Sequence, residues 1–223
     1  PDVVAPEFAI SGVAQHGGAV PAHATLTMAA PQGKIYYTTD GSDPRVPGSN
    51  VEFESHTLVG EFATKRAIMP TDGMDDFIWA DPSFDDSAWP TGTNGAGYER
   101  GDGYDALIDP SFDFIGQVAI AENETIYLRV EFDVADPAAL DTLTLLVRYD
   151  DGFVAYLNGV EIHRENAPGS EGSLVAWNEQ ATTSQADTAA VDFAIFDVSE
   201  HLSLLTARKN VLAIHGLNRG ATS

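Results

Sequence analysis

Carboxylate side chains in adjacent pairs are the first feature of this sequence that could do chemistry. They occur at Asp75-Asp76, Asp85-Asp86 and Asp150-Asp151. Hydrolysis of a glycosidic bond needs two carboxyl groups about 5–10 Å apart across a sugar, with one of them kept protonated. Neighbouring residues of a strand point to opposite faces, so no adjacent pair can do this alone. Capping of backbone N–H groups in turns explains the pairs more simply, and we predict no catalytic residues.

Other catalytic arrangements have little support in the sequence. Ser, His and Asp are all present, but no Gly-x-Ser-x-Gly elbow and no His-Glu-x-x-His motif occurs. Because Cys is absent, a disulfide, a thiolate zinc site and a Cys nucleophile are excluded. His163 and His215 fall in predicted strands, where we expect structural or surface roles.

An acidic, Gly-rich loop between residues 98 and 109 is the best candidate for a metal site. Calcium takes oxygen ligands from irregular loops, chiefly Asp, Glu and backbone carbonyl groups. The loop does not match an EF-hand, and acidic loops of this kind often bind no ion. We predict a structural Ca²⁺ here, with Asp102, Asp105 and Asp109 as the candidate ligands.

Aromatic side chains beside polar groups in loops indicate binding of a polysaccharide or other glycan. An aromatic ring offers about 150–250 Å² of surface on which a sugar ring can stack. For each aromatic residue a structural role is the alternative: Trp79 and Trp89 are expected in the core, and Tyr98 could be buried. The predicted ligand-binding residues are Tyr98, Arg100, Asp102, Tyr104, Trp177, Asn218 and Arg219.

Strand patterns dominate the elements that must position these residues. Residues 125–134 alternate, with Ile126 and Val130 on one face and Tyr127 and Arg129 on the other. Residues 142–149 repeat this alternation. Further strands are predicted at 153–157, 160–164, 191–198 and 210–217.

The turn and helix signals indicate an antiparallel arrangement of these strands. Asn158-Gly159 lies between two strand patterns and predicts a hairpin with a type I′ turn. Helix signals are confined to 136–140 and 199–205, too short for the crossovers of a parallel sheet. The predicted fold class is therefore all-β, an antiparallel β-sandwich of the jelly-roll type, with a small additional β segment at the N-terminus.

The charge balance limits the partners of this chain of 223 residues. Its formal net charge of −23 repels phosphate backbones and anionic lipids, so we expect neither nucleic acid nor membrane partners. No apolar run approaches the roughly 18 residues of a membrane-spanning helix. The hydrophobic share of 43% is ordinary for a folded protein.

The first quarter of the chain differs in composition from the rest. We therefore predict two domains, at 1–56 and 57–223. Residues 35–44, Ile-Tyr-Tyr-Thr-Thr-Asp-Gly-Ser-Asp-Pro, resemble the signature of the small β domain at the C-terminus of chitobiase and β-hexosaminidase. That resemblance implies an accessory segment without catalytic residues.

Four motifs in the second part resemble those of galactose-binding-like jelly-roll domains. They are Phe-Asp-Asp-Ser-Ala-Trp at 84–89, Gly-Ala-Gly-Tyr at 95–98, Asp-Asp-Gly-Phe-Val-Ala-Tyr-Leu-Asn-Gly at 150–159 and Asn-Val-Leu-Ala-Ile-His at 210–215. The resemblance implies a non-catalytic carbohydrate-binding module of a secreted, extracellular bacterial protein, beside other domains of the same chain. It also implies a further strand after Ser223. The alternatives are a structural spacer or adhesion module, or a small jelly-roll glycosidase or lyase.

Overall fold

The computed structural model describes residues 7–11, 13–14, 24–29, 35, 55–76, 78–98, 104–116 and 123–220. The chain divides into two compact units, Pro1–His56 and Thr57–Ser223. Strands predominate in both, and the few helices are short, so the prediction of an all-β, largely antiparallel fold is confirmed.

The first unit contains a small antiparallel sheet among its described residues. Its strands are β1 (Glu7–Ile10), β2 (Val13–Ala14) and β3 (Leu26–Ala29), in the order β2-β1-β3. Ser11 takes a positive φ of 48° in the turn between β1 and β2, where its backbone N–H donates to the carbonyl of Thr25 at 2.8 Å. The motif at 35–44 lies outside the described residues except for Ile35.

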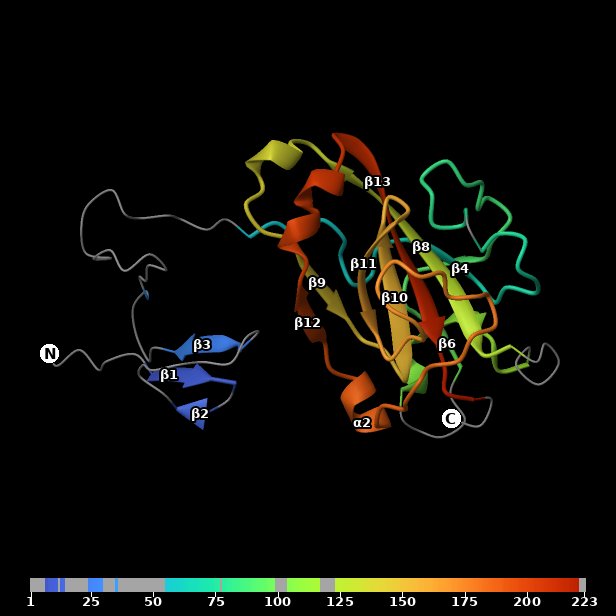
Figure 1. The fold of residues 1–223 in the computed structure, drawn as a ribbon, viewed down its shortest axis with the longest axis horizontal. Helices are drawn as coiled ribbons and strands as arrows, with labels where there is room; N and C mark the ends of the chain where they lie inside the picture. The colour runs from blue at the N-terminus through green and yellow to red at the C-terminus, as the bar shows by residue number, and fades with distance from the viewer. Residues whose placement is uncertain are drawn as a thin grey trace, which may run out of the picture. The chain divides into compact units, whose positions relative to one another are not determined.

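The second unit is built on a six-stranded antiparallel sheet in the order β11-β10-β13-β8-β4-β5. The long strands β8 and β13 lie side by side in its middle (Figure 1) and pair along their whole length. The bounds are β4 Lys65–Ile68, β5 Thr91–Gly92, β8 Thr125–Val134, β10 Gly152–Leu157, β11 Val160–Glu165 and β13 Arg208–Leu217.

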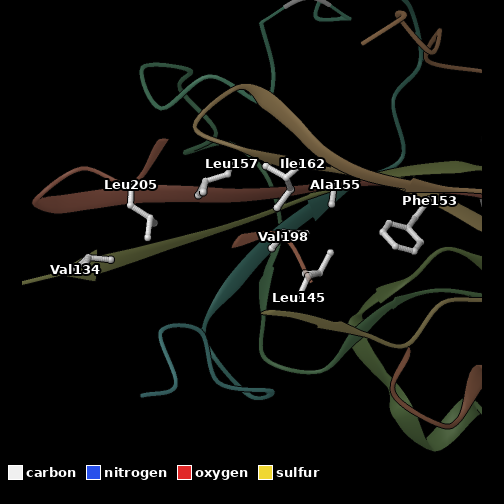
Figure 2. Packing of buried hydrophobic residues seen from close by; sticks show 8 residues of the cluster. All are labelled: Val134, Leu145, Phe153, Ala155, Leu157, Ile162, Val198 and Leu205. Carbon is white, nitrogen blue, oxygen red and sulfur yellow. The ribbon is translucent and has the colours of Figure 1, made fainter. Parts of the chain in front are cut away.

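Two strand pairs cover one face of this main sheet. β9 (Thr144–Val147) pairs with β12 (Ala194–Asp197), and β6 (Gly95–Gly97) pairs in parallel with β7 (Ile108–Asp113). Buried side chains from β9 meet those of the main sheet, which makes the unit a sandwich. Figure 2 shows this core, formed by Val134, Leu145, Phe153, Ala155, Leu157, Ile162, Val198 and Leu205.

The other face of the main sheet is also covered near its centre. The alternation predicted for 125–134 is present, yet Tyr127 and Arg129 on the second face are each only 1% exposed. The chain between β4 and β5 lies over them, because Trp79 and Arg129 contact each other there. The sheet therefore has a core on both faces, and the second core is the one that shapes the candidate site.

The predicted hairpin turn is confirmed, and both of the predicted short helices form as 3₁₀ turns. Asn158 (φ 52°) and Gly159 (φ 85°) both take the positive φ that a type I′ turn requires. The predicted helix at 136–140 is a 3₁₀ turn, Pro137–Ala139, which the Asp136 side chain caps. The helix predicted at 199–205 is 3₁₀ over Ser199–Leu204, preceded by Asp197, whose carboxylate accepts the Ser199 N–H at 3.0 Å. Further short helices span Asp105–Leu107 and Asp187–Ala190.

Candidate ligand-binding site

An aromatic cluster covers the second face of the main sheet, on which Tyr127 lies. Trp79 lies flat on Tyr127 of β8, with ring centroids 4.0 Å apart and planes 3° from parallel. Trp89 lies beside the same tyrosine at 6.4 Å, and Phe84 contacts Trp89 at 5.5 Å. Aromatic pairs of this kind contribute about 0.5–1.5 kcal/mol beyond the area that they bury. The cluster therefore seats the segment from Trp79 to Trp89 on the sheet.

A buried ion pair anchors the same segment. The carboxylate of Asp86 accepts hydrogen bonds from Nε of Arg129 at 2.7 Å and from Nη1 of Arg66 at 2.6 Å. Arg129 also donates to the backbone carbonyl groups of Trp79 and Asp81. Burial alone would raise the pKa of Asp86, but the hydrogen bonds and charges of the two guanidinium groups outweigh it and lower that pKa. Asp86 is therefore a structural anion.

A pocket of about 220 Å³ lies beside this aromatic cluster and shares Trp89 and Tyr127 with it. Trp89 and Tyr127 line it together with the loop that follows β4. Asp72 and Asp75 bring two carboxylates to that loop, and Met74 beside them is 83% exposed. The full lining is Ile68, Pro70, Thr71, Asp72, Met74, Asp75, Trp89 and Tyr127.

The acidic loop is tied to the aromatic cluster through Asp76. Its Oδ1 accepts the hydroxyl of Tyr127 at 2.8 Å, and its Oδ2 accepts the backbone N–H of Trp177 at 3.3 Å. Burial, followed by this bond to Asp76, raises the pKa of Tyr127, so its hydroxyl stays protonated and donates. Trp177 is half-buried, and its ring lies so close to Gly73 that a Cβ there would come within 2.9 Å of it. Trp177 thus flanks the loop that forms the pocket wall.

Two of the predicted ligand-binding residues form a hydrogen-bonded pair inside the protein. Tyr98 is 5% exposed, and its hydroxyl accepts a hydrogen bond from Nδ2 of Asn218 at 2.6 Å. The same hydroxyl donates to the carbonyl of Gly220 at 3.3 Å. Tyr98 packs in a core cluster with Phe112 and Phe114. These contacts connect the Gly-Ala-Gly-Tyr motif to the end of β13.

Tyr104 and Arg219 lie near the paired carboxylates at 150 and 151. The Tyr104 hydroxyl donates to Oδ2 of Asp150 at 2.8 Å. Asp151 is fully buried and accepts the backbone N–H of Arg219 at 2.6 Å and that of Gln185 at 3.0 Å. The Arg219 side chain is exposed. Asp151 therefore holds three segments together, which goes beyond the turn-capping role that its position suggested.

The predicted calcium ligands are only partly described. Arg100 and Asp102 lie outside the described residues, and Asp105 is exposed in its 3₁₀ turn. The carboxylate of Asp109 accepts backbone N–H bonds from Thr93 at 2.8 Å, Asn94 at 3.3 Å and Ser111 at 2.9 Å. The same bonds lower the pKa of Asp109 to about 2. Among the described residues no cluster of metal-ligating side chains is found, and the calcium site stays a prediction.

The pocket was not predicted from the sequence. Asp72, Met74 and Trp89 were not among the predicted ligand residues, whereas Trp177, which was, lies beside the loop that carries the first two. One signal was available: Met74 stands next to Asp75-Asp76 in a stretch without a strand or helix pattern. An apolar residue among acids in a loop is expected to be exposed.

A family model described as "Fn3 associated" matches residues 24–55. No curated protein matches the sequence. No helix among the described residues is long and apolar enough to cross a membrane.

The structure is similar to parts of several solved glycosidases. The exo-chitosanase CsxA of Amycolatopsis orientalis is 14% identical, with a TM-score of 0.43 over 71% of this chain and 16% of that chain. A calcium binding mutant of Bacteroides uniformis beta-glucuronidase 2 is 15% identical, with a TM-score of 0.38 over 69% and 14%. An uncultured Clostridium sp. beta-glucuronidase is 15% identical, with a TM-score of 0.38 over 70% of this chain and 21% of that chain. This chain thus spans between 14% and 21% of the length of these proteins.

Proposed function

We propose that the Thr57–Ser223 unit is a non-catalytic carbohydrate-binding module of a secreted, multidomain bacterial protein. The observation that carries this proposal is the pocket beside Trp89, which combines aromatic surface with carboxylates. Sugars present an apolar C–H face and hydroxyl groups, and they are bound by an aromatic side chain together with a few polar groups. The volume of about 220 Å³ is below the roughly 300–1,000 Å³ typical of drug-sized ligands, which suits one ring-sized unit.

The carboxyl groups whose pKa values are shifted have structural partners. A glycosidase needs one carboxyl group whose pKa is raised so that it can donate a proton. The shifts that are resolved among the described residues, at Asp81, Asp85, Asp86 and Asp109, are all downward. These four groups accept backbone or guanidinium hydrogen bonds, which stabilise the folded structure.

The test is affinity gel electrophoresis of the full chain in a panel of soluble polysaccharides, run with calcium and with EDTA. We expect at least one polysaccharide to retard the protein. Met74→Ala should weaken retardation without unfolding, because Met74 is 83% exposed. Phe62→Ala removes another exposed side chain away from the pocket and should leave retardation unchanged. Lack of retardation by every polysaccharide, with and without calcium, would refute the proposal.

A spacer or adhesion module is the second candidate, and one observation favours it. Leu146 on β9 and Ile195 on β12 lie directly opposite each other and are 51% and 66% exposed. Neighbouring exposed apolar side chains on a sheet can form part of an apolar patch, and large patches of this kind mark surfaces that contact another protein. Under this alternative Met74→Ala has no effect on any glycan, and the variant Leu146→Ser/Ile195→Ser loses association with neighbouring domains of the parent protein.

A further inference from the structure

The pocket beside Trp89 is acidic and contains no compensating cation. Two of its eight lining residues are Asp72 and Asp75, and none of these described lining residues is Lys or Arg. The formal net charge of the whole chain is −23, so the electrostatic potential from the rest of the protein has the same sign as the charge of the pocket lining. A ligand with a carboxylate or sulfate at this position would therefore be repelled, whereas a cation would be attracted.

The two lining carboxylates differ from the neighbouring Asp76 in what they bind. Both oxygens of Asp76 accept hydrogen bonds from the protein, one from Tyr127 and one from Trp177. Asp72 is exposed, and its Oδ1 accepts the backbone N–H of Met74 at 3.0 Å, which fixes the loop. Asp75 lines the pocket close enough to Tyr127 to contribute to the raised pKa of that phenol. Asp72 and Asp75 are thus the anions that a ligand meets.

The aromatic part of the pocket lining suits a sugar ring that carries a positive charge. Trp89 is half-buried and presents an aromatic ring, which attracts both the C–H face of a pyranose and a cation above the ring, whereas Tyr127 is 1% exposed and lies beneath Trp79. Burial raises the pKa of Tyr127, so it does not add a third negative charge. An ammonium group between the Trp89 ring and the two carboxylates would gain a cation–π interaction and charge-assisted hydrogen bonds together.

We propose that the pocket binds an amino sugar whose amine is free and protonated, with its ring against Trp89 and its ammonium group toward Asp72 and Asp75. This inference rests on the proposed carbohydrate-binding function and names the ligand class. An N-acetylated amine lacks the charge and adds bulk in a pocket of about 220 Å³. A uronic acid carries the wrong charge. Both should bind more weakly than the free amine.

The experiment is isothermal titration calorimetry of the full chain with two sets of oligosaccharides that differ only in N-acetylation. The probes are fully deacetylated chito-oligosaccharides and their fully N-acetylated counterparts, with oligogalacturonate as the anionic comparison. The buffer is at about pH 6, which is below the pKa of an ordinary primary amine. About 0.15 M salt screens the attraction between distant charges. We expect the deacetylated form to bind about tenfold or more tightly than either of the others.

Non-specific attraction of a polycation to an acidic protein is separated by matched variants. Asp72→Asn/Asp75→Asn should lower the affinity for the deacetylated oligosaccharide about tenfold. Asp141→Asn/Asp192→Asn removes the same charge from exposed positions outside the pocket lining and should leave affinity within about twofold. Thermal melts of both variants check that each remains folded. If both variants lose affinity equally, the attraction is non-specific and the assignment to this pocket is wrong.

The outcomes also separate this inference from the function on which it rests. Equal or tighter binding of the N-acetylated oligosaccharide, reduced by Met74→Ala, would refute the ammonium assignment and leave carbohydrate binding in place. Tighter binding of oligogalacturonate would do the same. Absence of heat with all three probes, together with no retardation by any polysaccharide in the gel panel, would refute both.

Discussion

Asp86 accepts a hydrogen bond from Nε of Arg129 at 2.7 Å, and through this bond a loop residue is held by a side chain in the centre of the main sheet. The two residues are 43 positions apart, and the Arg129 side chain is fully buried. The segment that brings Trp89 to the pocket is therefore held by a charge pair as well as by aromatic stacking.

Asp86→Ala should destabilise the protein strongly. The substitution leaves the guanidinium group of Arg129 buried without its carboxylate, and loss of one partner of a buried pair costs about 3–5 kcal/mol. Urea denaturation followed by tryptophan fluorescence measures the change in the free energy of unfolding. Asp85→Ala is the matched control: Asp85 is exposed and accepts the Ser87 N–H at 3.0 Å, so we expect a much smaller loss. Similar losses in both variants would contradict the anchoring role of Asp86.

Asn158→Gly should destabilise the hairpin although it keeps the backbone conformation of the turn. Glycine adopts the positive φ of 52° easily, but the variant loses bonds from Nδ2 to the Leu204 carbonyl and to Oδ1 of Asn210, both at 2.8 Å. It also loses the acceptor for the Val211 N–H at 2.8 Å. We expect a loss of about 1–3 kcal/mol in the free energy of unfolding by urea denaturation. An unchanged value would show that the side-chain network contributes nothing.

Tyr98→Phe should lower stability and leave glycan binding unchanged. The Tyr98 hydroxyl bonds to Asn218 in the interior, so its removal leaves a buried amide without that partner, at a cost of about 1–3 kcal/mol. Thermal melting measures the first effect and gel retardation the second. Reduced retardation by a folded Tyr98→Phe variant would instead support the ligand-binding role predicted for Tyr98 from the sequence.

Stability should fall as the pH drops from about 6.5 towards 4, because of His215. Its ring is fully buried, neither nitrogen has a partner among the described residues, and burial lowers its pKa to about 3. The unfolded chain therefore binds a proton that the folded protein does not, which costs at most about 1.4 kcal/mol per pH unit.

His215→Leu is the comparison for this pH effect. The variant should show a flatter profile of unfolding free energy between pH 6.5 and 4 in urea titrations at several pH values. The pKa of Asp109 is lowered from 3.8 to about 2, so its contribution begins to fall below about pH 5, but it does so equally in both proteins and cancels in the comparison. Parallel profiles of wild type and variant above pH 4 would show that His215 is not the group responsible.

The strands and their connections could be predicted well from the sequence because they depend on local patterns. Alternation places β8 at Thr125–Val134, and Asn158-Gly159 determines the turn before Val160. Asp85 could likewise be predicted as a turn cap from its distance of two residues to Ser87.

The candidate site could not be predicted in this way, because it depends on contacts between distant segments. Tyr127 alternates onto the second face as expected, but nothing near it in sequence indicates that Trp79 would cover it. The difference between Asp75 and its neighbour Asp76 arises only when Tyr127 and Trp177 reach one of them. Tyr98 has a motif of its own, yet it is buried against Phe112 and its hydroxyl bonds to Asn218, 120 residues away.

The position of β13 in the sheet has a consequence for the order of folding. β13 lies between β8 and β10 and pairs with both, although 73 residues or more separate its first residue, Arg208, from the end of β8 at Val134. On a ribosome, β8 and β10 would be made long before the strand that joins them. Pairings of such wide sequence separation form slowly, and until β13 arrives the edges of β8 and β10 are open to other chains. We therefore expect refolding in milliseconds to seconds, with aggregation that increases with protein concentration during that interval.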